Sequence, residues 1–134
     1  MEDYCSAGLQ PSGEPERDVH RLGVVCGAPT GLEPLAPAHT RTFDEPATIA
    51  THRLERAECV RVIAASSSDE AIDLEWKAQG DVLAHCQLKR LGLCPERAAL
   101  CPEVEGARLL EVELVLSNPL EVGVALRLWR RKDR

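Results

Sequence analysis

Cysteine is the residue type in this chain with the richest chemistry, because a thiol can form a disulfide, bind a metal or act as a nucleophile. Six cysteines occur in the 134 residues: Cys5, Cys26, Cys59, Cys86, Cys94 and Cys101. An even number predicts a disulfide framework if the compartment is oxidising. Six cysteines allow fifteen pairings, and sequence spacing alone cannot choose among them.

Two pairings have a structural rationale as disulfide candidates. Cys59 opens one expected strand and Cys101 leads toward another, so a bond between them is geometrically feasible. Closing this loop would stabilise the fold by about 4 kcal/mol in the chain-entropy model. The other candidate disulfide joins Cys86 with Cys94, which are close in the sequence, across the loop between them. Cys5 and Cys26 are available to tether the N-terminal segment, and the remaining interpretation is that the cysteines stay as free thiols.

Two metal hypotheses can be stated and weighed. The zinc hypothesis rests on His85, Cys86, Cys94 and Cys101. It lacks the tight Cys-x₂₋₄-Cys pair of structural zinc sites, and adjacent residues on a strand point to opposite faces. The calcium hypothesis rests on Asp69, Glu70, Asp73 and Glu75. These fit a turn and the solvated face of a strand better, since no EF-hand pattern occurs. We therefore expect no metal and no cofactor.

A cysteine–histidine nucleophile is the enzymatic hypothesis, because such partners need only meet in space. The four histidines are His20, His39, His52 and His85. None lies in a local context typical of a thiol enzyme, and no G-x-S-x-G, H-E-x-x-H or Gly-rich phosphate loop occurs. We therefore expect no catalytic residues and no enzyme activity.

Charge and composition narrow the partner classes further. The net charge is −6, and aromatic residues make up 3% of the chain. An acidic chain repels phosphate backbones, and few aromatic side chains are present to stack on bases or sugars. A basic cluster at the C-terminus is better explained as a solvated end: Arg127, Arg130, Arg131, Lys132 and Arg134. Nucleic acid is therefore not an expected partner.

The elements that position these residues are predicted from hydrophobic alternation after about residue 42. Period-two alternation is typical of half-buried strands. It appears most clearly at 71–77, 109–117 and 122–129. Further strands are expected at 58–65 and 82–87, with an edge strand at 49–54.

Turn chemistry completes the predicted fold. Residues typical of turns stand between the expected strands, at 66–69, 79–81, 105–106 and 117–119. About four residues separate the last two strands, so they are predicted to pair as a hairpin. The fold class that follows is all-β: a single antiparallel, jelly-roll-like β-sandwich.

The N-terminal part has a different composition. Residues 1–40 contain five of the nine prolines and five of the nine glycines. This density predicts a loop-rich, partly ordered lead-in before a sandwich domain at 41–131, with a short strand possible only at 22–26. No stretch is apolar enough to span a membrane, and the acidic start 1–4 is not followed by an apolar leader segment. The expected location is extracytoplasmic, in the periplasm or cell envelope, if a leader was removed, and otherwise cytoplasmic.

The order of segments over residues 47–130 resembles the bacterial pre-peptidase C-terminal (PPC) domain and its relatives. The segments that carry the resemblance are 51–54, 58–65, 72–76, Gly106 with 109–116, and 122–129. The family commonly has Asp-Leu-Asp-Leu in the third segment, and this chain keeps Asp73 and Leu74 between Ile72 and Glu75. The resemblance implies a sandwich without chemistry of its own that assists secretion, folding or attachment, and some relatives bind calcium or matrix polymers.

Two functions from different classes remain beside the enzymatic one. The first is an accessory or binding module of an exported or envelope bacterial protein, acting through a surface or an exposed edge strand. Its partner would be a protein or a surface polymer, and the module itself would be a monomer or a weak oligomer. The alternative is a cytoplasmic protein-interaction or scaffold domain in which the cysteines stay reduced.

Overall fold

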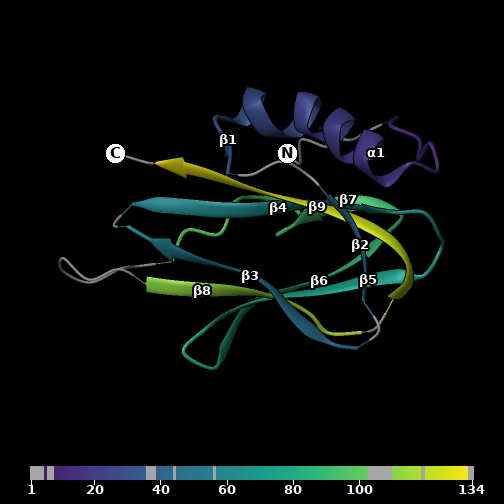
Figure 1. Ribbon diagram of the computed structural model, residues 1–134. Helices are drawn as coiled ribbons and strands as arrows, with labels where there is room; N and C mark the ends of the chain where they lie inside the picture. The colour runs from purple at the N-terminus through teal and green to yellow at the C-terminus, as the bar shows by residue number, and fades with distance from the viewer. Residues whose placement is uncertain are drawn as a thin grey trace.

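Two antiparallel sheets lie face to face, and a short helix covers the outer face of one of them (Figure 1). The computed structural model describes residues 5, 8–35, 39–43, 45–55, 57–102, 110–118 and 120–132. Strands dominate these residues, and all strand pairs are antiparallel. The predicted all-β antiparallel sandwich is therefore confirmed.

We call the two layers sheet A and sheet B. Sheet A contains β1 (Glu33–Pro34), β2 (His39–Phe43), β4 (Glu58–Ser66), β7 (Leu91–Cys94) and β9 (Leu120–Lys132). Its order is β1-β9-β4-β7, and β2 also pairs with β9. Sheet B contains β3 (Ala47–Leu54), β5 (Ala71–Ala78), β6 (Asp81–Lys89) and β8 (Leu110–Leu116), in the order β3-β8-β5-β6. The predicted edge strand at 49–54 lies within β3, at one edge of sheet B.

Alternating burial places the main core between the sheets. β5 and β8 bury every second residue, as their sequences predict. A fully buried aliphatic side chain contributes about 1.5–3 kcal/mol relative to an exposed one, so this layer stabilises the sandwich. Its largest members are Trp76, Leu54, Ile72, Leu74, Leu114 and Leu116.

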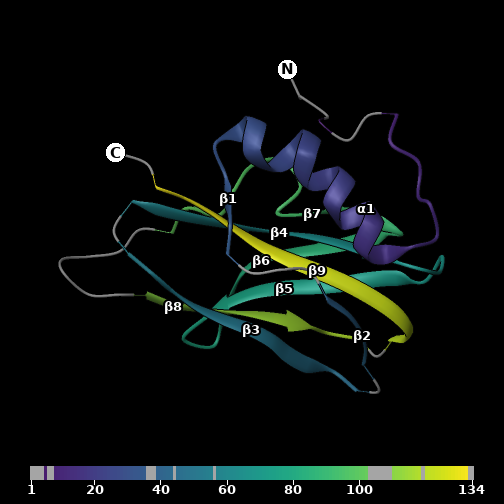
Figure 2. The ribbon, with the colours of Figure 1, turned by 45° about the horizontal axis from the view of Figure 1, so that its top comes forward.

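The outer face of sheet A is buried as well. β4 is buried at every position, so both of its faces are covered. Its second cover is helix α1 (Pro15–Leu22), followed by a π-helical turn at Gly23–Gly27 and a 3₁₀ turn at Ala28–Thr30 (Figures 1 and 2). A second apolar cluster forms there: Val19, Leu22, Cys26, Leu32, Ile63, Ala65, Leu93, Ala125 and Trp129.

The strand predicted at 22–26 is wrong, because these residues continue the helix that begins at Pro15. Proline favours the first turn of a helix, where its missing N–H is not needed. Acidic residues in the first turn and basic ones in the last suit the helix dipole. Gly27 lets the turn approach sheet A closely, since a Cβ there would lie 2.6 Å from the ring of Trp129. Proline and glycine thus shape this helical segment rather than prevent it.

The predicted hairpin between the last two strands is also wrong, because β8 lies in sheet B and β9 in sheet A. The residues after β8 bond to β5. The Ser117 amide donates to the Asp73 carbonyl at 2.8 Å, and the Asn118 side chain accepts from the Asp73 amide at 3.1 Å. Two consecutive strands that each have one apolar face can pair within one sheet, or they can lie in different sheets that pack face to face. A short connection between the strands is compatible with both arrangements.

Candidate binding groove beside strand β6

All six cysteines are bonded in disulfides. The pairs are Cys5–Cys26, Cys59–Cys101 and Cys86–Cys94. The second and third are the two candidate pairs named from the sequence. With no free cysteine, the oxidised chain offers no thiolate as a nucleophile or zinc ligand.

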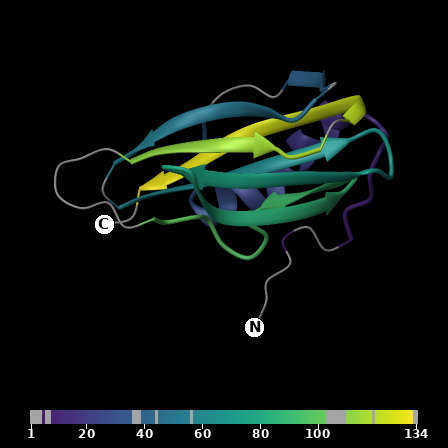
Figure 3. The same ribbon diagram turned by 90° about the horizontal axis from the view of Figure 1, so that it is seen from below.

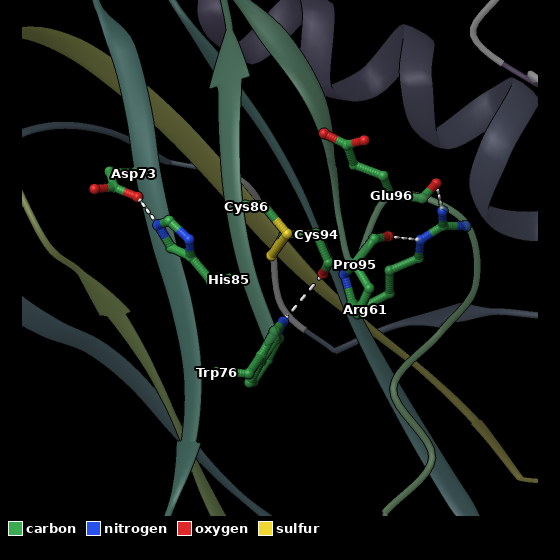
Figure 4. Close-up of a disulfide and its surroundings, with 8 residues drawn as sticks. All are labelled: Arg61, Asp73, Trp76, His85, Cys86, Cys94, Pro95 and Glu96. Atoms are coloured by element: carbon green, nitrogen blue, oxygen red, sulfur yellow. Dashed lines mark hydrogen bonds and ion pairs between the residues drawn. A yellow bond between two sulfur atoms is a disulfide. The ribbon is translucent and has the colours of Figure 1, made fainter. Parts of the chain in front are cut away.

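The Cys86–Cys94 disulfide joins the two sheets at one side of the sandwich (Figure 4). β6 is an edge of sheet B, β7 is an edge of sheet A, and the chain passes between them through Arg90, whose φ is 63°. Both cysteines are buried. The indole N–H of Trp76 donates to the Cys94 carbonyl at 3.0 Å. A covalent bond and a buried hydrogen bond therefore fix the same corner.

A loop leaves sheet A directly after this disulfide. On β4, Val62 lies opposite Cys94, and Val60 lies opposite Leu100. An unbroken ladder would place residue 96 opposite Val60, so four extra residues bulge out here. Leu100 returns to the sheet through backbone bonds of 2.7 and 2.9 Å with Val60. The Cys59–Cys101 bond follows at the next position, and we call residues 95–101 the disulfide-framed loop.

Arg61 holds the start of this loop. Its buried side chain donates from Nε to the Pro95 carbonyl at 2.7 Å, and its guanidinium also donates to the Glu96 carbonyl (Figure 4). Burial, and next the positive charge of Arg131, lowers the pKa of Arg61 from its ordinary value. An arginine guanidinium nevertheless stays charged in proteins. A lone arginine within the apolar run 58–65 is the sequence signal that marks this role, since a buried charge needs hydrogen-bond partners.

A groove of about 610 Å³ separates the disulfide-framed loop from β6. Residues 83–87 line one side and residues 95–101 the other. A hollow of about 280 Å³ lies at the β6–β7 corner and shares Glu96 and Arg97 with the groove. The apolar part of the groove lining consists of Leu83, Ala84, Pro95, Ala98, Ala99 and Leu100. The groove lining thus combines an apolar surface with the charged residues Glu96 and Arg97.

β6 brings a free backbone edge to this groove. It pairs with β5, and among the described strands none pairs with its other edge, as the view of sheet B in Figure 3 shows. Leu83 is an extra residue in the β5–β6 ladder, because Trp76 lies opposite Ala84 and Lys77 opposite Val82. Bulges of this kind re-aim side chains at sheet edges. Val82 and Leu83 are 50% and 37% exposed, so apolar side chains lie along an edge that no other described strand covers.

Three of the four carboxylates considered for calcium have separate partners. Asp73 bonds to the ring of His85 (Figure 4), and Glu75 accepts from the Ser117 hydroxyl at 3.0 Å. Asp69 pairs with Arg90 at 2.7 Å, and Glu70 is exposed. Within the described ranges, no three His, Cys, Asp or Glu side chains are grouped so that they could hold a metal.

The four zinc candidates do not share one site, because Cys86 is bonded to Cys94 and Cys101 to Cys59. His85 lies on the outer face with Asp73, whereas Cys86 points inward and is bonded to Cys94. His52 is also engaged elsewhere, with its Nε2 atom 3.3 Å from Oε1 of the buried Glu58. The adjacent positions of His85 and Cys86 therefore separate them, as strand geometry predicts.

The chain matches no protein family, no curated protein and no solved structure. The resemblance to PPC domains over residues 47–130 therefore stays a prediction. Across the described part of the chain, no helix has the length and apolarity that a membrane crossing requires. The fold and the groove are thus the observations on which a functional proposal rests.

Proposed function

We propose that the protein is a non-catalytic binding module that holds an extended polypeptide segment of a partner between β6 and the disulfide-framed loop. One observation carries this proposal. Among the described strands, β6 has no partner at the edge away from β5; β6 forms one wall of the groove, and the opposite wall is fixed by disulfides at both of its ends.

The geometry suits the addition of one strand to sheet B. A segment lying beside β6 would bond through its backbone to the free edge, which gives affinity with little dependence on sequence. Its side chains would alternate between the apolar loop wall and the outer face near His85 and Gln87. A wall that is already ordered reduces the entropy lost on binding. The expected ligand is therefore an extended segment with small apolar side chains at every second position.

The disulfides support an oxidising setting for this module. Structural disulfides persist in secreted and periplasmic proteins and are rare in the cytosol. Together with the resemblance to PPC domains, they support an accessory module of an exported or envelope bacterial protein. The alternative, a cytoplasmic scaffold domain with reduced cysteines, differs from this proposal in its number of free thiols. Denatured protein from the native compartment should contain no free thiols, and six free thiols would support the cytoplasmic alternative.

A displayed library of random dodecapeptides, selected against the oxidised protein, tests the proposal. We expect enriched sequences with alternating small apolar residues. Backbone amide shifts on binding should change most at 83–87 and 95–101. Failure to enrich any peptide, or shift changes centred on another surface, would contradict the proposal.

Charged substitutions in the groove provide the matched comparison. Leu83→Lys places a charge at the free edge, a common natural way to prevent strand addition. We expect this variant to weaken peptide binding more than about tenfold, which corresponds to about 1.4 kcal/mol. Val24→Lys is the control, because Val24 is 58% exposed on the helical segment beyond sheet A. Equal losses in both variants would exclude the β6 edge as the binding site.

A further inference from the structure

We propose that the Cys59–Cys101 disulfide is a redox-controlled closure of the groove. A dithiol reductant reduces this disulfide before the other two. Its reduction loosens the wall of the groove that the disulfide-framed loop forms. The effect on ligand binding rests on the proposed function, whereas the order of reduction rests on geometry alone.

The exposure of the cysteine residues separates the three disulfides. Cys101 is exposed, whereas Cys5 is half-buried and Cys86 is 6% exposed. The other three cysteines have no exposed surface: Cys26, Cys59 and Cys94. Exchange requires a thiolate to reach a disulfide sulfur, so an exposed cysteine is attacked fastest. We expect reduction in the order Cys59–Cys101, then Cys5–Cys26, then Cys86–Cys94.

A guanidinium stands beside the same bond. Arg131 lies opposite Cys59 in the β4–β9 ladder, and its Nη2 atom is 3.9 Å from the sulfur of Cys59 and 3.9 Å from that of Cys101. A nearby cation stabilises thiolate over thiol. Arg131 therefore stabilises the negative charge that develops on the departing sulfur.

The exchange can be written in full for a dithiol reductant of the dithiothreitol or thioredoxin class. Its thiolate attacks Sγ of Cys101, forms a mixed disulfide and releases Cys59 as a thiolate beside Arg131. The second thiol of the reductant, once deprotonated, attacks its own sulfur in the mixed disulfide and releases Cys101. In the overall reaction two electrons pass to the protein and the reductant becomes a disulfide. The thiolates of Cys59 and Cys101 then take up one proton each.

Opening this bond affects one end of the disulfide-framed loop. The end near Pro95 keeps the Arg61 hydrogen bond and the Cys86–Cys94 disulfide. The end near Leu100 keeps its two backbone bonds to Val60 but loses its covalent link to β4. Residues 98–101 are therefore the part of the groove wall that loosens.

Timed reduction tests the order. The protein is treated with limiting dithiothreitol at pH 8, alkylated, digested and analysed by mass spectrometry. We expect Arg131→Gln to slow opening of Cys59–Cys101 about fivefold, since about 1 kcal/mol of charge stabilisation is lost. Arg131→Lys should restore most of the rate. Lys132→Gln, which removes a neighbouring charge that pairs with Glu55, should not change it. Earlier opening of either other disulfide, or an unchanged rate in Arg131→Gln, overturns the proposal.

Two further measurements separate this inference from the proposed function. Hydrogen exchange of the singly reduced protein should accelerate at 98–101 and not at 62–65. A selected dodecapeptide should bind the singly reduced form at least about fivefold more weakly, because the wall is no longer ordered beforehand. Unchanged exchange at 98–101 or unchanged affinity overturns the redox closure. If no peptide binds the oxidised form, the proposed function fails while the reduction order stands or falls by itself.

Discussion

β4 and β6 are both nine-residue strands, yet their surroundings are opposite. β4 is buried throughout and pairs with both β9 and β7. β6 has exposed residues along most of its length, and among the described strands it pairs with β5 alone. β4 needs two covers because both of its faces are apolar, and it receives them from sheet B and from α1. This difference is the reason that we propose β6, rather than β4, as the strand beside which a partner segment adds.

Trp76 offers the strongest way to break the layer that covers the inner face of β4. Its ring is fully buried between the sheets, and its N–H bonds to Cys94. We expect Trp76→Ala to lower the free energy of unfolding by about 4 kcal/mol, through lost burial and the cavity that remains. Urea unfolding followed by circular dichroism measures the change.

Exposed Val82, on β6, provides the matched control for Trp76. Val82→Ala should change the free energy of unfolding by less than about 0.5 kcal/mol, because Val82 lies at the surface. Trp76→Phe should lose about 1–2 kcal/mol, mainly by leaving the Cys94 carbonyl without its donor. Similar losses in the Ala variants at 76 and 82 would contradict the contrast between the two strands.

Gly27 tests the outer cover of sheet A. A Cβ at this position would lie 2.6 Å from the ring of Trp129, so Gly27→Ala forces the helical segment away from the sheet. We expect the free energy of unfolding to fall by about 2 kcal/mol, which is typical of overpacking. Tryptophan fluorescence should change as well, because Trp129 loses part of its cover. Val24→Ala, at an exposed site of the same turn, should leave both measurements unchanged.

The two layers that cover β4, sheet B on one face and α1 on the other, also show what could be predicted from the sequence. Strict alternation at Ile72, Leu74 and Trp76 identifies the inward face of β5, so the sandwich follows from the pattern. Apart from Glu58 and Arg61, the run 58–65 is apolar on both faces, and this is the signal for a second cover. The proline- and glycine-rich composition before residue 40 obscured that cover, because the same residue types begin helices and permit close packing.

The groove was less accessible to sequence reasoning. The two cysteine pairs that frame it could be named as candidates, but spacing could not choose between them and the alternatives. The contact between Val60 and Leu100 joins residues 40 positions apart, and no local pattern records it. The placement of β8 in sheet B and β9 in sheet A was not predicted for the same reason, because it is decided by tertiary packing and not by a local sequence pattern.

The smallest expected effect concerns Glu55, at the turn that leads into β4. A hydrogen bond from Lys132 and its charge lower the pKa of Glu55 from its ordinary value. A lowered folded-state pKa stabilises the fold above the unfolded value, and this contribution disappears as the pH falls through the folded value. Lys132→Met should therefore raise the pKa of Glu55, as measured by carboxyl NMR titration. An unchanged pKa would show that the pair does not form in solution.

Amide hydrogen exchange, read residue by residue in β4 and β6, tests the open edge most directly. At Val62–Ala65 every amide should be protected, because β4 is paired on both sides. In β6, amides directed toward β5 should be protected, while those directed outward between 82 and 85 should exchange at least about a hundredfold faster. Uniform protection of β6 at the level of β4 would contradict the account, because it would show that the edge is already occupied.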